Sequence, residues 1–224
     1  MPPPGRLIVF EGVEGAGKST QLGLLAAHLR RAGVVVDDLR EPGGTPAGNE
    51  IRRLLLDSSH DITFRAEALL FMASRAQLVE REIGPALASG RLVLLDRFLL
   101  STYAYQSAGR GIPVEDIRAA NALATAGLVP DLTVLLDLPD GEGMARAARR
   151  SEQDRMELSG HDFHARVAGA FRSFATPGWQ RSHPECGPIV IVDGAGGERV
   201  VAQRITRELG KRWPETFPVI GGLE

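Results

Sequence analysis

Lysine is almost absent from this sequence of 224 residues. Only Lys18 and Lys211 occur, whereas 24 residues are arginine, so nearly every positive side chain is a guanidinium. Lys18 lies in the glycine-rich stretch Gly12–Ser19. An ammonium kept in that stretch, in a chain that otherwise uses arginine, indicates a site that needs a compact point charge.

The sequence also has only one cysteine, no long apolar run and little net charge. The single Cys186 excludes an intrachain disulfide framework and fits a reducing compartment. No apolar run approaches the ~18 residues that span a bilayer, and the first residues, Met1–Gly5, lack the pattern of a signal peptide. A net charge of −2 gives no footprint for nucleic acid. We therefore expect a cytoplasmic protein with small-molecule partners and no nucleic acid or membrane partner.

Five short apolar runs predict the strands of one sheet. Helical patterns fill the intervals between the runs, which lie at 7–10, 34–36, 92–95, 132–136 and 189–192. Strands that alternate with helices predict an α/β fold with a parallel sheet covered on both faces. No repeat or low-complexity linker divides the chain, so we expect a single domain over residues 1–224. Ligands of such sheets bind beyond the carboxyl ends of the strands.

The glycine-rich stretch follows the first apolar run and precedes a helical pattern with Leu22, Leu25, Ala26 and Leu29 on one face. This is the context of a phosphate-binding loop, in which glycines let backbone N–H groups surround a phosphate at a helix start. Lys18 would reach the β- and γ-phosphates, and the Ser19 hydroxyl would bind Mg²⁺. The predicted ATP-binding residues are Gly12, Val13, Glu14, Gly15, Ala16, Gly17, Lys18, Ser19 and Thr20.

Two further stretches follow predicted strands. The turn 40–46 is rich in glycine and proline and ends where Thr45 can cap a helix beginning at Pro46; it is either a rigid connector or part of a site. Asp96, at the end of the third strand, would bind magnesium or its water, and the adjacent Arg97 would clamp a phosphate. We predict Ser19 and Asp96 as the metal site and rank Asp137 below Asp96.

Aromatic and basic side chains suggest the rest of the site. Phe71 and Arg75 are four residues apart and share a helix face, which suits stacking on a nucleobase and hydrogen bonding to it, although an aromatic residue alone is more often core. A run of arginines occupies residues 146–155. It is either a solvated face or, given the phosphate-binding loop, a lid segment of about 146–160 that closes over transferring phosphates.

Taken in order, these blocks resemble those of bacterial thymidylate kinases over essentially the whole chain. The phosphate-binding loop alone is shared by many NTPases, whereas the ordered set is specific. The matching blocks are Phe10-Glu11-Gly12 through Thr20, Glu41-Pro42-Gly43-Gly44-Thr45, Phe71 with Ser74-Arg75, Asp96-Arg97 through Ser101, Tyr105-Gln106 and Asp154-Arg155-Met156-Glu157. The resemblance implies a P-loop NTPase fold of the nucleoside monophosphate kinase type with a five-stranded parallel sheet. It also implies a homodimer that converts dTMP to dTDP with Mg-ATP, in dTTP synthesis.

The resemblance also implies roles for individual residues. Phe71 would stack on thymine, Arg75 would contact its carbonyl oxygen, and Arg97 would hold the dTMP phosphate. Glu14 would hold the sugar 3′-hydroxyl, and Tyr105 would crowd the place of a 2′-hydroxyl. The dTMP-binding set is then Glu14, Phe71, Arg75, Arg97, Ser101, Thr102, Tyr105 and Gln106. The catalytic set is Lys18, Arg97, Arg149, Arg150 and Arg155.

The chain departs from parts of the family. Its loop has Glu14-Gly15-Ala16 where one branch carries an arginine, and the bacterial branch supplies that arginine from the lid. Thr102 stands where some relatives carry asparagine. A kinase for another nucleoside monophosphate is one alternative. A P-loop switch protein is the other, but a GTPase switch needs an Asn-Lys-x-Asp motif, which two lysines at 18 and 211 do not provide.

Overall fold

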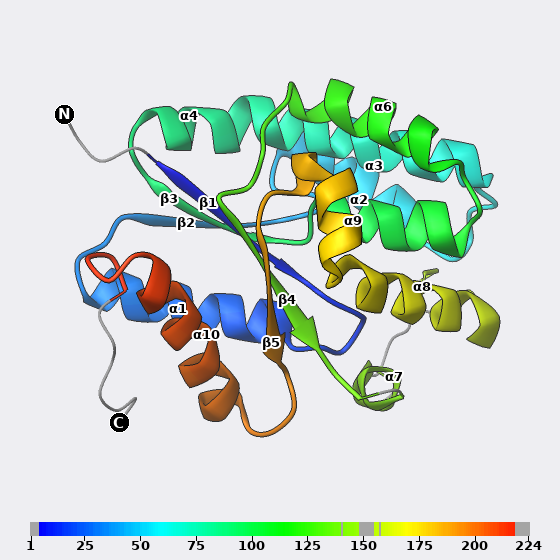
Figure 1. Ribbon diagram of the computed structural model, residues 1–224. Coiled ribbons are helices and arrows are strands. Elements are labelled where there is room, and N and C mark those ends of the chain that lie inside the picture. The colour runs from blue at the N-terminus through cyan, green and yellow to red at the C-terminus, as the bar shows by residue number, and fades with distance from the viewer. Residues whose placement is uncertain (1–4, 140, 148–154, 157, 218–224) are drawn as a thin grey trace.

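The core of the molecule is a five-stranded parallel sheet with strand order β2-β3-β1-β4-β5 (Figure 1). The computed structural model describes residues 5–139, 141–147, 155–156 and 158–217. The strands are β1 (Arg6–Glu11), β2 (Val36–Arg40), β3 (Leu92–Asp96), β4 (Leu132–Asp137) and β5 (Ile189–Asp193). The predicted fold class and strand count are therefore confirmed.

The second strand begins later than the apolar run 34–36 predicted. β2 lies at an edge of the sheet and pairs with β3 alone, so one side of the strand faces water. Its residues alternate accordingly: Val36 is buried, while Asp38 and Arg40 are exposed. The predicted run covered only the start of the strand because an edge strand needs no continuous apolar sequence. Arg40 consequently lies at the carboxyl end of β2, level with Asp96 of β3.

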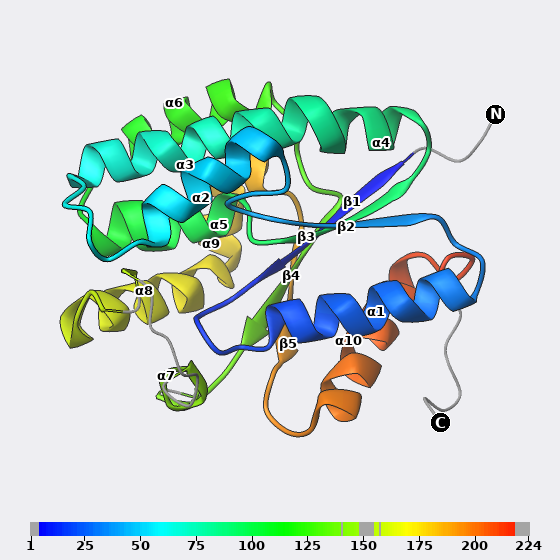
Figure 2. The same cartoon turned by 180° about the vertical axis from the view of Figure 1, so that it is seen from behind.

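Helices cover both faces of the sheet (Figures 1 and 2). One face is covered by α1 (Lys18–Arg31) and α10 (Glu198–Arg212). The elements packed on the other face are α2 (Pro46–Leu56), α3 (Phe64–Leu78), the π-helical turn η1 (Val79–Ile83), α4 (Gly84–Ala88), α5 (Leu99–Thr102), the π-helical segment η2 (Tyr103–Gly109), α6 (Val114–Thr125), α8 (His161–Phe174), α9 (Pro177–Ser182) and the 3₁₀ turn η3 (Pro184–Cys186). The short α7 (Glu142–Ala147) follows β4 beyond the carboxyl end of the sheet.

The sheet separates two hydrophobic cores because successive side chains of a strand point to opposite faces. Leu7 and Val9 of β1 pack with α3, α4, α5, α6 and α8, whereas Ile8 and Phe10 pack with α1 and α10. All four are at most 1% exposed. Full burial of such a side chain stabilises the fold by about 1.5–3 kcal/mol. The central strand is thus fixed from both sides, and with it the loop that follows.

The parallel arrangement brings the ends of β1, β3 and β4 to one edge of the sheet, where α1 begins. The predicted apolar face of α1 is confirmed, since Leu22, Leu25, Ala26 and Leu29 are all buried. Thr45 caps α2 as predicted and accepts a hydrogen bond from the Gly48 amide at 2.9 Å. Among the described residues, no helix is long and apolar enough to cross a membrane.

Candidate active site

The glycine-rich stretch forms a tight loop between β1 and α1. Gly15 has φ 75°, and a Cβ there would lie 2.1 Å from the carbonyl oxygen of Gly143 in α7. Gly17, at the N-terminus of α1, has φ 89°. Side chains at these positions would be strained or would clash, so glycine allows the backbone to curl here. The loop presents the N-terminus of α1 to whatever binds beside it.

Lys18 is only 5% exposed, and its ammonium lies inside this loop. Its Nζ donates hydrogen bonds to the carbonyl oxygens of Gly12 at 3.0 Å and Val13 at 2.8 Å. Burial lowers the pKa of Lys18 to about 8, and the nearby Arg97 guanidinium acts in the same direction. A phosphate placed against this ammonium would favour its charged form.

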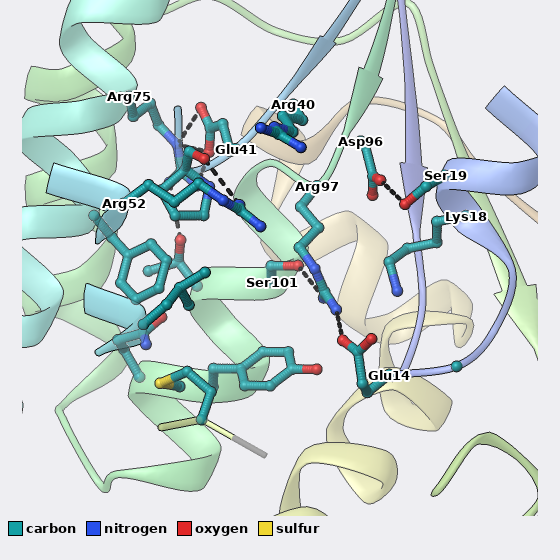
Figure 3. Close-up of a pocket in the computed structure, with 18 of the residues that line it drawn as sticks. Glu14, Lys18, Ser19, Arg40, Glu41, Arg52, Arg75, Asp96, Arg97 and Ser101 are labelled. Carbon is teal, nitrogen blue, oxygen red and sulfur yellow. Dashed lines mark hydrogen bonds and ion pairs between the residues drawn. The ribbon is translucent and has the colours of Figure 1, made fainter. Parts of the chain in front are cut away.

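Ser19 and Asp96 come together as predicted (Figure 3). The Ser19 hydroxyl donates to Oδ2 of Asp96, while the buried Oδ1 of Asp96 accepts no hydrogen bond from the described residues. A hydroxyl oxygen beside a carboxylate oxygen with a spare lone pair suits Mg²⁺, which prefers oxygen ligands. Asp137 is exposed at the end of β4 and does not line the cavity that Ser19 and Asp96 share. The geometry therefore favours Asp96 over Asp137.

Arg97 reaches from the end of β3 into the same space. Its Nη2 donates to Glu14 of the loop at 2.6 Å and its Nη1 to Ser101 at 3.1 Å, and its guanidinium lies 5.2 Å from the centre of the Tyr105 ring. The backbone of Arg97 has φ 70°, in the left-handed region that side chains rarely adopt. Such strain persists only where the surroundings impose it, and it is frequent at functional sites.

Glu11, which the sequence analysis did not select, holds the turn that carries Arg97. Its carboxylate is fully buried and accepts hydrogen bonds from the amides of Phe98 at 2.8 Å and Ser101 at 3.0 Å. It also accepts one from the Ser101 hydroxyl at 2.7 Å. A glutamate directly after the apolar run 7–10 was the signal that could have revealed it. Ser101 is thereby fixed by Glu11 on one side and bonded to Arg97 on the other.

Lys18, Ser19, Asp96, Arg97 and Ser101 line one cavity of about 230 Å³. Its walls come from the loop after β1 with the start of α1, the ends of β2 and β3, α2, α3, α5, η2, Met156 and α8. The predicted site residues on these walls are Glu14, Gly15, Gly17, Lys18, Ser19, Thr20, Phe71, Arg75, Asp96, Arg97, Ser101, Thr102, Tyr105 and Gln106. The fold thus brings residues from distant parts of the chain to one cavity, as their predicted roles require.

Arg75 is 2% exposed, and all the N–H groups of its guanidinium have acceptors within the protein. Its Nε and Nη2 donate to the Glu41 carboxylate at 2.9 and 2.6 Å. The remaining N–H groups point to Thr102 at 2.9 Å, to the Phe98 carbonyl oxygen at 2.8 Å and to Asn121. A guanidinium has five N–H donors, so each already has a protein acceptor. A base carbonyl near Arg75 would have to share one of them.

Tyr105 is 8% exposed and has two surroundings at once. One side of its ring packs near Phe163 and Phe171 of α8, with ring centres 6.1 and 6.3 Å apart. The residue also lines the cavity beside Arg97. Tyr105 is therefore both a core residue and a wall of the site.

Arg155 is bound by residues of α2 and α3. Its Nη2 is 2.7 Å from the Glu67 carboxylate, and its Nε donates to the Leu55 carbonyl oxygen at the end of α2 at 2.8 Å. These contacts give no support to the predicted catalytic role of Arg155. The other predicted lid arginines, Arg149 and Arg150, lie outside the described residues.

Two arginines of the cavity were missed by the sequence analysis. Arg40 ends β2, and Arg52 projects from α2 with its Nη1 donating to the Pro42 carbonyl oxygen at 3.0 Å. Figure 3 shows both side chains on the side of the cavity opposite Lys18. In a chain with 24 arginines, neither position stands out from the sequence. Together with Arg97 they add positive charge to this part of the cavity.

Comparison with known proteins identifies the family. The thymidylate kinase family model matches residues 10–181. Thymidylate kinase of Deinococcus radiodurans is 49% identical over 208 residues, covering 93% of this chain and 98% of that protein. Thymidylate kinase of Chlorobium chlorochromatii is 44% identical over 217 residues, covering 92% and 95%. The crystal structure of thymidylate kinase from Ehrlichia chaffeensis superimposes with a TM-score of 0.72 at 28% identity, covering 92% of this chain and all of that one. The chain belongs to the thymidylate kinase family.

Proposed function

We propose that this protein transfers the γ-phosphoryl group of ATP to dTMP and releases ADP and dTDP. The observation that carries the proposal is one cavity lined by two groups of cations, Lys18 in the phosphate-binding loop and the arginines around Arg97. Phosphoryl transfer needs positioning and neutralised charge, and it needs no nucleophilic side chain. A cavity that places two phosphates side by side between cations meets that need.

The donor half of the cavity is the loop together with the start of α1. The loop amides and Lys18 would hold the β- and γ-phosphates, and Ser19 and Asp96 would hold Mg²⁺. The bound ion would add positive charge between the phosphate oxygens. The contact between Ser19 and Asp96 keeps both ligands together.

The acceptor half lies between Arg97 and Phe71. Arg97, fixed by Glu14 and Ser101, would clamp the monophosphate, with Arg40 and Arg52 adding charge at the same end. Phe71 would stack on the base. The 3′-hydroxyl is proposed to meet Glu14 beside Arg97, and Tyr105 to fill the space beside C2′.

Charge that develops on the transferred group needs a further cation near the donor half. We assign this role to Arg150, with Arg149 as the second candidate. Two observations support this assignment: the loop contains no arginine, and Arg155 is engaged by Glu67. A closed arginine segment would also exclude water, which suppresses ATP hydrolysis.

The protein is further proposed to act as a homodimer in the cytoplasm. Three neighbouring helices, α2, α3 and α6, each carry a well-exposed leucine: Leu54 at 37%, Leu69 at 65% and Leu123 at 86%. Exposed apolar side chains on adjacent elements are typical of an interface. Sedimentation at micromolar concentration measures the mass, and a monomer there would contradict the homodimer. The cytoplasmic location rests on the single cysteine.

The test is a direct ADP-release assay with ATP and four acceptors, dTMP, dUMP, dCMP and UMP. The proposal expects the highest kcat/KM with dTMP and no ADP release without acceptor. Lys18→Ala serves as the active-site control and should lower turnover about 10³-fold, since one preorganised charge is worth several kcal/mol. Faster turnover of another monophosphate would replace dTMP as the substrate. Near-normal turnover in Lys18→Ala would refute the role of the loop.

A further inference from the structure

A buried carboxylate stands behind the acceptor half of the cavity. Glu67 of α3 is 0% exposed, and three side chains make four contacts with its carboxylate. Arg110 donates from Nε to Oε1 and from Nη2 to Oε2, both at 3.2 Å, and Nη2 of Arg155 lies 2.7 Å from Oε2. The fourth contact comes from Gln106, whose Nε2 donates to Oε1 at 3.0 Å. Glu67 is not itself a wall of the cavity, whereas Gln106 is.

The two arginines fix the carboxylate in place. Arg110 is held by the Ser159 hydroxyl at 3.0 Å and lies over the Phe163 ring at 4.3 Å, while Arg155 is held by the Leu55 carbonyl oxygen. Because both guanidinium groups have further partners, they cannot follow Glu67 if it moves. The carboxylate is a rigid acceptor whose position is set from two sides.

This rigid acceptor determines which end of the Gln106 amide faces the cavity. A carboxylate has only acceptor oxygens, so the amide must turn its NH₂ group toward Glu67. The carbonyl Oε1 of Gln106 then points away, and it receives no hydrogen bond from the part of the chain that the structure describes. The cavity is therefore offered an acceptor at this position, next to Phe71 and Thr102.

We propose that Glu67 is a positioning residue for base selection, which rests on the proposed function of the site. Through the Gln106 amide it presents an acceptor to the ring nitrogen N3 of the bound pyrimidine. Thymine and uracil carry N3–H, a donor, whereas N3 of cytosine is an unprotonated acceptor. An acceptor facing an acceptor leaves both unpaired in a buried site, and such sites reject the wrong partner strongly. Glu67 would thus exclude cytosine nucleotides without touching them.

The test compares kcat/KM for dTMP, dUMP and dCMP in the parent protein and in Glu67→Gln. An amide at position 67 can accept from or donate to Gln106, so the Gln106 amide is free to turn over. The ratio of dTMP to dCMP should fall at least tenfold, while the ratio of dTMP to dUMP, which share N3–H, should stay unchanged. A purely structural role would scale all three substrates together.

Four companion variants make the test specific. Glu185→Gln is the matched control, because Glu185 also binds an arginine and an η2 residue, Arg118 and Tyr103, but does not line the cavity; it should leave both ratios unchanged. Gln106→Met should lower the dTMP to dCMP ratio, and adding Glu67→Gln to it should lower the ratio no further. If Glu67→Gln melts below the assay temperature, the double variant Glu67→Gln with Arg155→Met takes its place. The second substitution removes the guanidinium that Glu67→Gln leaves without its carboxylate partner.

The outcomes separate the inference from the function beneath it. A parent protein whose kcat/KM for dCMP equals or exceeds that for dTMP refutes the proposed preference for dTMP and the inference with it. A parent that selects dTMP, together with an unchanged dTMP to dCMP ratio in Glu67→Gln, refutes the role of Glu67 alone. A further fall of the ratio in the Gln106→Met background also refutes it, because Glu67 would then act by another route.

Discussion

Replacing Arg75 by methionine should cost the protein much of its stability and less of its substrate binding. Methionine retains an apolar stem but leaves Glu41, which is 5% exposed, without its cation. Removing one partner of a buried pair destabilises by about 3–5 kcal/mol. Since 1 kcal/mol shifts the Tm of a chain of 150–250 residues by about 2–4 °C, the Tm should fall by roughly 6–20 °C.

A double variant separates the two roles of Arg75. In Glu41→Gln with Arg75→Met no buried charge is left unpaired, so most of the lost Tm should return. The assay is a thermal melt of the parent, both single variants and the double variant, with the dTMP KM measured well below the lowest Tm. A Tm within about 2 °C of the parent and a 100-fold rise in KM for Arg75→Met would show that Arg75 serves the base and not the fold.

Three further predictions concern the chemistry. Burial lowers the pKa of Lys18 in the ligand-free protein to about 8, so kcat/KM for ATP should decline above that pH, while kcat should stay constant to a higher pH. Parallel pH profiles of kcat/KM and kcat would contradict this. Arg150→Ala should lower kcat far more than dTMP affinity, and an unchanged kcat with a much raised KM would assign the segment to acceptor binding. Tyr105→Ala should lower the Tm and narrow, by up to about 10²-fold, the preference for dTMP over its ribose counterpart; an unchanged preference would leave Tyr105 a core residue only.

The architecture was predictable because it depends on patterns that are local in sequence. Four of the five strands are continuous apolar runs, and the phosphate-binding loop needs glycines at fixed spacing next to a lysine. The exception is β2, whose edge position lets polar residues such as Asp38 face water. The loop residues, Asp96 and Arg97 follow from the strand ends, since parallel strands bring those ends together.

The residues that support the site were not predictable in the same way. Glu67 stands in a helical pattern as any solvent-facing glutamate would, and only the folded chain shows its contacts with Gln106, Arg110 and Arg155. Arg155 was predicted to act on phosphates because it lies in an arginine run, yet its contacts are with α2 and α3. Local pattern gives the chemistry of a residue type, whereas its partner depends on tertiary contacts.

Because of the left-handed backbone of Arg97, thermal stability and activity favour different residues at position 97. An L-residue held at φ 70° carries roughly 1–2 kcal/mol of strain that glycine would not. Selection for heat resistance alone would therefore favour glycine at position 97, and selection for growth would restore arginine if its guanidinium clamps the acceptor phosphate as proposed. In a laboratory population selected alternately for heat resistance and for growth, codon 97 would alternate between glycine and arginine, whereas neighbouring core positions would not change.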